Sequence, residues 1–408
     1  MGLGLGYYKN KDKLETMKKV ICAFGKYQYG DEHRGLSTEY FSFIPAFEEL
    51  GYEVFHFDSW NSSLYADYAD LNSKFLSFVD DVKPDIIFAV TLGYEIWSES
   101  WEAVRQKNNP LLVHWSTDDS WKFREHSVFI ATYFDLNVTT YEEFVPKYQE
   151  IGANVFLSGW GCPVQWMSEP KKAAKCRYGV TFVGSAHGNR KELVSKLKEL
   201  GVDVECFGYG WGNGAVSADE IPEIFRDSVI SLNFANSKGE NQIKARTFEV
   251  PGSGGFLITD NARNLSLVFD DRQEIVVVNS IEEMANSIKK FTADYGVRDE
   301  IAYKGFLKVQ NKYSYARRVA DILDFAAKLE RNKDKNQAID FAALRAGHRL
   351  SVWLKLFRFL LVGIGKIVFG KDRGLRFARR ACFEFEWRVR GAKTYGCTGW
   401  TGRMFYGY

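Results

Sequence analysis

The sequence predicts an α/β protein built from two parallel-sheet units, followed by a basic helical tail. Three observations lead to this prediction. Short apolar segments alternate with longer amphipathic ones over most of the 408 residues, and apolar strands between helices are typical of parallel sheets covered on both faces. The alternation pauses near residue 170 and then restarts. Apolar residues make up 46% of the chain and charged residues 26%, which excludes a disordered chain and allows two cores.

The first unit is expected over residues 18–165. Its strand-like segments are 18–24, 53–57, 84–90, 111–115, 136–139 and 154–157, and its clearest helices are 36–50 and 64–82. Residues 1–17 precede the first strand and lack the apolar core of a signal peptide. We therefore interpret them as a leader or an extension.

The second unit is expected over residues 178–330, after a linker at 166–177. Its strand-like segments are 178–183, 204–207, 229–233, 255–259 and 275–278, and its clearest helices are 281–290 and 313–329. Ligands of such sheets bind at the carboxyl ends of the strands, near the crevice between the two units. Candidate site residues are therefore expected where strands end.

The tail, residues 331–408, differs in charge from the rest of the chain. It has 17 Lys and Arg against 5 Asp and Glu, a local charge of +12, whereas residues 1–330 carry a charge of −10. Within the tail, residues 351–369 are mostly apolar but contain three cations, Lys355, Arg358 and Lys366. Three cations make a membrane-spanning helix costly, so we expect a helix that lies in the membrane surface.

The expected partner of residues 351–390 is an anionic membrane surface, at the inner face of the cell membrane. Trp353, Phe357 and Phe359 would insert into it. Five further cations would meet the headgroups: Lys371, Arg373, Arg376, Arg379 and Arg380. Packing on the protein itself or on another subunit is the alternative, which leaves a homo-oligomer open. Nucleic acid is not an expected partner, because the body of the chain is acidic.

The cysteines and the missing motifs narrow the classes of function. The six cysteines form no CxxC pair and no cluster with His, which favours a reducing cytoplasm and no metal site. No GxGxxG, GxSxG, HExxH or DxD motif occurs, which argues against dehydrogenases, serine hydrolases, zinc peptidases and metal–nucleotide sites. Residues 25–30 have the glycine spacing of a P-loop, but Asp31 and Glu32 stand where Lys and Ser/Thr are required.

The most informative segment is residues 242–260, which is expected to form a helix, a glycine turn and a buried strand. The helix carries Lys244, Arg246 and Glu249. Arg and Lys neutralise a diphosphate, and a carboxylate accepts hydrogen bonds from ribose hydroxyls. Gly254 and Gly255 allow close approach to a donor, because they carry no side chain. An ordinary surface ion pair on one helix face is the alternative.

This segment and two strands, Val180-Thr-Phe-Val-Gly-Ser185 and Ser228-Val-Ile-Ser-Leu-Asn233, resemble the C-terminal half of GT-B glycosyltransferases. The likeness is greatest to the CgeB-like (spore maturation protein type) group, in which Lys-x-Arg-x-Phe-Glu precedes a small-residue turn and Gly-Phe-Leu. It extends over roughly residues 18–325 and leaves the tail outside. The resemblance implies two Rossmann-like domains that face a cleft, and sugar transfer from a nucleotide sugar without a metal or other cofactor.

Carried onto this sequence, the resemblance assigns the donor site to the second unit. Glu249 would hold the donor ribose, and Lys244 and Arg246 would face the diphosphate. The further candidates, at the end of the first strand, are Gly184, Ser185 and the weaker His187. The loop at 209–213 either flanks the base or is a glycine turn with a packed Trp.

The acceptor site is expected in the first unit. Residues 25–35 follow its first strand, and the acceptor-binding candidates among them are Tyr27, Tyr29, Asp31, Glu32 and Arg34. The general base is expected among Asp118, Asp119 and His33. For the two aspartates the alternative is capping of a helix expected at 121–129, and His114 is interpreted as a core histidine.

The predicted function is transfer of a glycosyl unit from a nucleotide sugar to a cell-surface, lipid-linked or spore-coat glycan. The enzyme would be cytoplasmic and peripheral to the membrane. The alternative is a non-catalytic scaffold that keeps a GT-B-like shell and binds membrane or protein partners through its tail. A nucleotide-sugar epimerase or dehydrogenase is disfavoured because its glycine fingerprint is missing.

Overall fold

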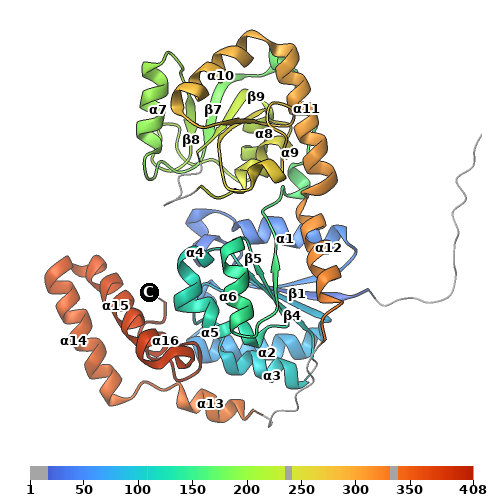
Figure 1. Cartoon of the computed structure of the whole chain (residues 1–408). Helices are drawn as coiled ribbons and strands as arrows, with labels where there is room; N and C mark the ends of the chain where they lie inside the picture. The colour runs from blue at the N-terminus through green and yellow to red at the C-terminus, as the bar shows by residue number, and fades with distance from the viewer. Residues whose placement is uncertain (1–16, 108, 235–240, 331–338, 408) are drawn as a thin grey trace, which may run out of the picture.

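The computed structural model describes residues 17–107, 109–234, 241–330 and 339–407. It contains two parallel sheets, one above the other in Figure 1, each packed with helices. The predicted fold class is confirmed: the chain is an α/β protein with two sheet-containing units and a helical C-terminal region. The interpretation of residues 1–16 as part of a leader falls outside the described residues.

The first unit is built on a six-stranded sheet of order β2-β1-β3-β4-β5-β6, with parallel pairing throughout. The strands are β1 (Lys19–Ala23), β2 (Glu53–Phe57), β3 (Ile86–Ala89), β4 (Leu111–Ser116), β5 (Leu136–Thr139) and β6 (Val155–Leu157). All four residues of β3 are buried. Strands covered on both faces explain why the sequence shows continuous apolar segments here rather than alternation.

The helices of this unit follow the predicted order. They are α1 (Thr38–Glu49), α2 (Tyr68–Val82), α3 (Ser98–Lys107), α4 (Asp119–Lys122), a π-helical turn (Phe123–Ser127), α5 (Val128–Ile130) and α6 (Val145–Glu150). Ser37 begins α1, because its hydroxyl accepts a hydrogen bond from the Tyr40 backbone N–H at 3.0 Å. This cap places Glu39 in the first turn of α1, next to the loop that follows β1.

The second unit has a five-stranded parallel sheet of order β11-β10-β9-β7-β8. Its strands are β7 (Tyr178–Val183), β8 (Glu205–Phe207), β9 (Ser228–Asn233), β10 (Leu257–Asp260) and β11 (Val276–Val278). Its helices are α7 (Arg190–Glu199), α8 (Glu220–Arg226), α9 (Arg246–Gly252), α10 (Ile281–Ala293) and α11 (Tyr295–Lys312). The strands expected from the sequence are confirmed within two residues at each end.

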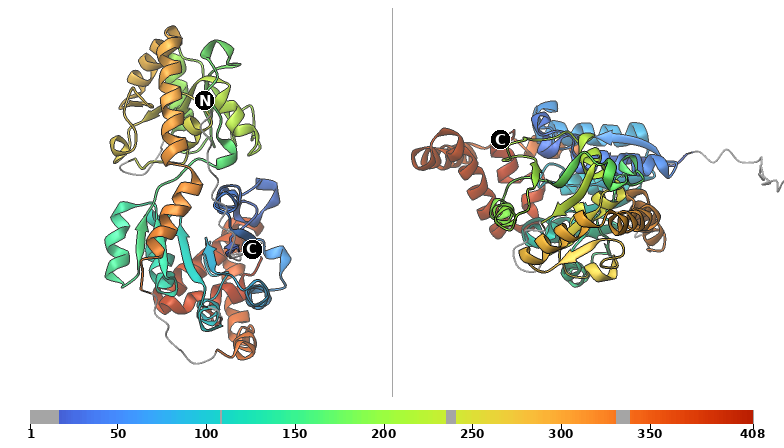
Figure 2. Two further views of the ribbon diagram at one scale, coloured as in Figure 1. Left: turned by 90° about the vertical axis from the view of Figure 1, so that its right-hand side faces the viewer. Right: turned by 90° about the horizontal axis from the view of Figure 1, so that it is seen from above.

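The last helix assigned to the second unit belongs to the first. Helix α12 (Tyr315–Ala326) runs back to the lower sheet in Figures 1 and 2 and packs Tyr315 and Val319 into its core, beside Phe43. The two segments that connect the units are hydrogen-bonded to each other, with 2.9 Å between the Cys162 N and the Tyr313 O. The expected boundary at residue 330 is therefore wrong for this helix. Its apolar periodicity predicts a buried face but not which sheet buries it.

The C-terminal region is a folded appendage on the first unit. It comprises α13 (Phe341–Gly347), α14 (Val352–Phe369), α15 (Lys371–Arg390), a 3₁₀ turn (Gly391–Tyr395) and α16 (Trp400–Met404). We call residues 339–407 the appendage. Phe383, Trp387 and Tyr395 join the core of the first unit. Helices α14 and α15 form a hairpin, with α14 on the outside (Figure 1).

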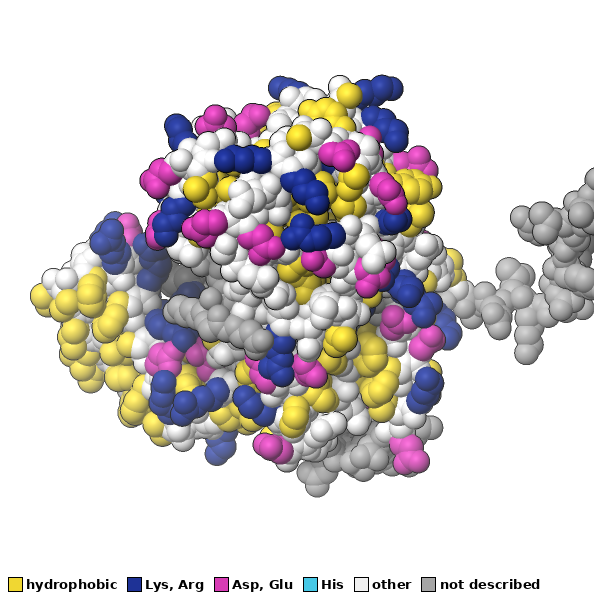
Figure 3. Space-filling view, turned by 45° about the horizontal axis from the view of Figure 1, so that its top comes forward, with side chains coloured by type: hydrophobic (Ala, Val, Ile, Leu, Met, Phe, Trp, Pro, Cys, Tyr) yellow, Lys and Arg dark blue, Asp and Glu magenta, His cyan; other side chains and the backbone are white. Residues whose placement is uncertain are grey.

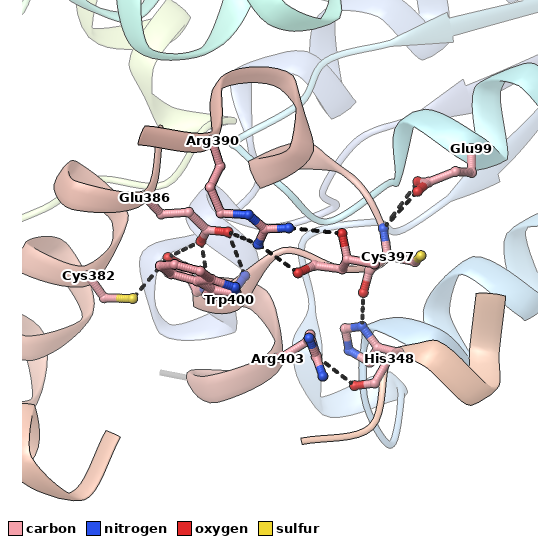
Figure 4. A network of polar contacts seen from close by, with 10 residues as sticks. Glu99, His348, Cys382, Glu386, Arg390, Cys397, Trp400 and Arg403 are labelled. Atoms are coloured by element: carbon pink, nitrogen blue, oxygen red, sulfur yellow. Dashed lines mark hydrogen bonds and ion pairs between the residues drawn. The ribbon is translucent and has the colours of Figure 1, made fainter. Parts of the chain in front are cut away.

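Polar contacts hold the appendage together and also attach it to the first unit, as Figure 4 shows. The buried Glu386 carboxylate accepts hydrogen bonds from the backbone N–H groups of Trp400 and Thr401, at 2.6 and 2.7 Å. The backbone N–H of Cys397 donates to the Glu99 carboxylate of α3 at 3.1 Å. The prediction of helices here holds, and the alternative of packing on the protein itself is confirmed for α15, because Phe383 and Trp387 join the core of the first unit.

Two further observations concern the whole described chain. All six cysteines are unpaired thiols. Within the described ranges, every helix is too short or too polar to span a lipid bilayer.

Candidate active site

A cavity of about 940 Å³ opens where the strands of the first sheet end. Its walls come from the loops after β1, β3 and β4, from the start of α9 in the second unit, and from α15 of the appendage. The crevice between the units is the place that the strand order predicts for a ligand.

On the second unit, three cations converge beside this cavity. Arg246 donates from Nε to the Val183 carbonyl at 3.2 Å, at the end of β7. Arg190 donates to the carbonyls of Ser185 and Phe234, each at 3.0 Å. These bonds fix both guanidinium groups at the carboxyl ends of β7 and β9.

Burial and neighbouring charges shift the pKa of two of these cations, Arg190 and Lys244. Burial lowers the pKa of Arg190, and the neighbouring Arg246 charge lowers it further. Burial also lowers the pKa of Lys244, and Arg190 contributes in the same direction, whereas Asp118 of the first unit opposes it. Holding like charges close together in a partly buried place costs free energy, because each charge disfavours the charged form of its neighbour. An anionic ligand would relieve this repulsion.

Glu249 is the acidic member of this cluster. It is only 2% exposed and receives a hydrogen bond from Arg246, three residues earlier in α9. The pair is therefore not the ordinary surface ion pair that was the alternative, since the Arg246 side chain is only 26% exposed. Glu249 lies where the resemblance placed a ribose-binding carboxylate. That role stays a prediction.

The glycines of the second unit divide into two groups. Gly184 directly follows β7, and its carbonyl accepts a hydrogen bond from the Trp211 indole at 2.8 Å. The loop at 209–213 is thus a glycine turn with a packed Trp, held over the end of β7. Ser185 and His187 are exposed beside it, and His187 contacts Arg190 at 3.3 Å.

Gly254 and Gly255 have a different role from the one predicted. A Cβ on Gly254 would lie 2.6 Å from the Ser168 carbonyl oxygen, and one on Gly255 would lie 2.9 Å from that of Phe225. Both residues are buried against the protein's own backbone. The prediction that they contact a donor is wrong, because the close approach that they allow is between segments of this fold.

On the first unit, the adjacent residues Asp118 and Asp119 have different surroundings. Asp119 is fully buried and accepts hydrogen bonds from the hydroxyls of Ser116, Ser127, Thr139 and Tyr148 at 2.6 to 3.2 Å. It holds β4, β5 and the π-helical turn together, so the prediction of Asp119 as a base is wrong. Asp118 lines the cavity and does not cap α4 with its side chain.

The structure adds a carboxylate that the sequence analysis missed. Glu39 lines the same cavity as Asp118 and Lys122. Burial raises its pKa to about 7, Lys122 lowers it and Asp118 raises it. A carboxylic acid that titrates near neutrality is suited to general acid–base chemistry. The available signal was a Glu in the first turn of a helix, directly after a strand-end loop.

Only some residues of the loop after β1 line the cavity. Tyr29, Asp31 and Arg34 line the cavity. The Tyr27 hydroxyl instead donates to the Glu32 carboxylate at 3.3 Å, outside the lining. His33 is also solvent-exposed and outside the lining, which contradicts its prediction as the base.

His114 is a core histidine, as interpreted. Its Nε2 lies 3.0 Å from the Thr91 hydroxyl. Burial, with Lys122 as a second cause, lowers its pKa to about 3. His126 shares the Thr91 hydroxyl at 3.3 Å, and burial lowers its pKa as well. Both rings contact the loop after β3, and His126 also lines the cavity.

The appendage forms one wall of the cavity through Arg379, Arg380 and Phe383 of α15. Arg380 pairs with both carboxylate oxygens of Glu125 at 2.8 and 3.2 Å. The Tyr395 hydroxyl donates to the Glu125 carbonyl. Arg379 and Arg380 thus line the cavity side of α15, and their contact with membrane headgroups stays a prediction.

Comparisons with known proteins agree with this architecture. Residues 190–324 match a family described as glycosyl transferase-like. The structure is similar to sucrose-phosphate synthase from Thermosynechococcus elongatus, with a TM-score of 0.53 at 11% identity. It is also similar to HepE of Anabaena in complex with UDP and glucose, with a TM-score of 0.52 at 10% identity. Each match covers 76% of this chain and 100% of the other.

No curated protein sequence matches significantly. At these identities the structural likeness concerns the fold. The chain therefore has the GT-B fold, and residues 190–324 are similar to a glycosyl transferase-like family. Membership of the CgeB-like group stays a prediction.

Proposed function

We propose that this protein is a glycosyltransferase that moves a sugar from a nucleotide sugar to an acceptor bound in the cavity. The observation that carries the proposal is that Arg190 and Arg246, tied to strand-end carbonyls, and Lys244 lie beside a cavity that Asp118 and Glu39 line. A cationic face meets a carboxylate face across one crevice. Supporting this, HepE, which shares the fold, was crystallised with UDP-glucose.

The donor would bind on the second unit. Its diphosphate would contact Arg190, Lys244 and Arg246, and its ribose would hydrogen-bond to Glu249. Arg246 now pairs with Glu249, so donor binding would turn the guanidinium from the carboxylate to the phosphates. The three cations would hold the diphosphate in place of a metal ion, which is why we expect transfer without a metal.

The transfer step would use both faces. An acceptor hydroxyl oxygen forms a bond to the anomeric carbon, and the bond from that carbon to the diphosphate oxygen breaks. The leaving electron pair stays on the nucleoside diphosphate, where the cations stabilise it. The hydroxyl proton passes to Glu39 or Asp118, which both line the cavity.

The cavity lining fits a carbohydrate acceptor. Tyr29, Trp60, Trp121 and Trp160 offer aromatic faces, and Asp31 adds a carboxylate. Aromatic surfaces with a few polar groups are typical of small-molecule sites. We propose a cell-surface or spore-coat glycan, or its lipid-linked precursor, as the acceptor class, and a place at the inner face of the cell membrane.

Binding of nucleotides tests the donor half of the proposal. UDP, GDP and CMP are titrated into the protein, and the melting temperature is followed, because a ligand of the native state raises it. We expect one nucleotide to raise it clearly and its sugar conjugates to be hydrolysed slowly. The absence of any shift with all three would contradict the proposal and favour a non-catalytic scaffold.

A further inference from the structure

The outer side of α14 is an apolar surface that the rest of the described chain leaves uncovered. Six apolar residues share this side of the helix, because they lie three or four positions apart except for the adjacent pair Phe359 and Leu360, and they are 52–87% exposed: Val352, Leu356, Phe359, Leu360, Ile364 and Ile367. We call these six residues the α14 face. Figure 3 shows apolar side chains gathered over the hairpin at the left edge of the molecule, with Lys and Arg beside them. A patch of this kind marks an interaction site.

The orientation of α14 is fixed by its inner side. Leu354 is buried in a small core with Ala378 and Cys382 of α15. Farther along, the two helices touch backbone to backbone, since a Cβ on Gly365 would lie 2.4 Å from the Gly374 carbonyl oxygen. The packed side of the helix is therefore occupied by α15, and the α14 face points outward as a built feature of the fold.

The charge around the α14 face indicates which kind of partner it binds. Helix α14 carries Lys355, Arg358 and Lys366 and no acidic residue. Over residues 351–390 there are ten Lys and Arg against three Asp and Glu, a local charge of +7. A second copy of the chain would bring two such segments together, which like charge disfavours. An anionic surface complements them.

We infer that the α14 face docks onto an anionic lipid bilayer, with the helix lying in the plane of the surface. The apolar side chains enter below the headgroups, and Lys355 and Lys366 extend their ammonium groups to headgroup level. An 18-residue helix is about 27 Å long, so the face offers a continuous strip of contact. Phe357, expected to insert, instead packs within the hairpin.

Docking would bring the cavity alongside the bilayer. The hairpin is two helices thick, and α15 lines the cavity while α14 carries the apolar face. This consequence rests on the proposed function: the acceptor would be anchored in the same bilayer by a lipid, with its sugar in the cavity. The docking itself does not depend on nucleotide-sugar chemistry.

Vesicle flotation of the full chain, without nucleotide, tests the inference. Vesicles of phosphatidylcholine are compared with an equimolar mixture of phosphatidylcholine and phosphatidylglycerol. We expect the protein to float with the anionic vesicles and much less with the neutral ones. The variant Leu356→Ser/Phe359→Ser/Ile367→Ser should lose at least about ten-fold in binding, and Lys355→Gln/Lys366→Gln about five-fold per lysine.

The matched control is Leu267→Ser, which removes an equally exposed leucine (80%) from the second unit. It should float like the unaltered protein. Equal melting temperatures for all variants establish that the fold is intact. Two results would overturn the inference: unaltered protein that floats with neither vesicle, or a triple variant that floats normally.

Size-exclusion chromatography provides the remaining outcome. A dimer that the triple variant converts to a monomer would mean that a second copy covers the α14 face, and the inference would fail. Nucleotide binding is measured without vesicles, so its result is independent of the flotation result. A protein that binds vesicles but no nucleotide would refute the proposed function and leave the docking surface in place.

Discussion

The two faces of the crevice hold their charges in opposite ways. On the second unit, Arg190 and Arg246 are tied to strand-end carbonyls, and neighbouring positive charge lowers the pKa of Arg190 and of Lys244. On the first unit, Glu39 is a carboxyl whose pKa burial raises to about 7. The comparison separates two tasks. One face is organised to hold negative charge at any physiological pH, whereas the other is organised to exchange a proton near neutrality.

The largest effect is expected from the carboxylate face. Glu39→Gln should lower glycosyl transfer by about 10²–10⁴-fold, because the general base is lost, while nucleotide affinity stays unchanged. Transfer by the unaltered protein should rise with pH through about 7, as Glu39 loses its proton. Asp118→Asn should move this midpoint downward, since the Asp118 charge is one of the causes that raise the pKa of Glu39.

Steady-state rates from pH 5 to 9 measure both effects. The control is Glu49→Gln, at the exposed far end of the same helix. Full activity in Glu39→Gln together with loss in Asp118→Asn would assign the base to Asp118. Full activity in both would refute the role of this face.

On the cationic face, Lys244→Ala and Arg246→Ala should each weaken nucleoside diphosphate binding by about ten- to a hundred-fold, as expected for a charge-assisted hydrogen bond. Isothermal titration calorimetry measures the change. Lys191→Ala, an exposed cation in the first turn of α7, should bind normally. A loss shared by all three variants would indicate general electrostatics rather than a site.

The buried His114 of the first unit predicts that the folded protein loses stability in acid. The folded-state pKa of His114 lies at about 3, below its ordinary value of 6.5. The folded protein therefore binds fewer protons than the unfolded chain, and stability is lost as pH falls from 6.5 toward 3. Between pH 6.5 and pH 5 the loss should be about 2 kcal/mol. Denaturant unfolding of the protein and of His114→Gln measures this, and an equal pH dependence in both would contradict it.

The smallest effect is expected for the contact by which α15 of the appendage is held at the cavity wall. Arg380→Met removes the pair with Glu125, whose side chain is 11% exposed. Because Arg380 itself is half exposed, we expect a loss of about 1 kcal/mol in the free energy of unfolding. Lys304→Met, which breaks an exposed pair with Glu300, should cost about half as much or less. A smaller loss in Arg380→Met than in this control would mean that the pair does not hold the appendage.

The sequence was informative where a function depends on neighbours in the chain. Lys244, Arg246 and Glu249 lie within one short segment, so their spacing predicted that they would lie close together. The prediction that one helix carries all three is wrong for Lys244, because α9 begins at Arg246. The alternation of apolar strands and helices likewise predicted both sheets. By contrast, Glu39 and Asp118 are 79 positions apart, and only the order of strands in the sheet brings them into one cavity.

Burial separated residues that look alike in sequence. Asp118 and Asp119 are adjacent carboxylates, yet one lines the cavity and the other accepts hydrogen bonds from four hydroxyls. Gly254 and Gly255 also resembled ligand-binding glycines until the backbone packed against them was known. A pattern of residue types does not contain these distinctions, because they depend on what lies on the far side of each residue.

By itself, the sequence determined the α/β class, the two sheets, the cationic helix end and the basic, apolar character of residues 351–369. These properties follow from periodicity and composition, which are local. The tertiary structure alone decided that α12 returns to the first sheet, that α15 closes the cavity, and that α14 turns its apolar face outward. An amphipathic helix carries the information that one face must be buried, but its partner is selected by packing among segments far apart in the chain.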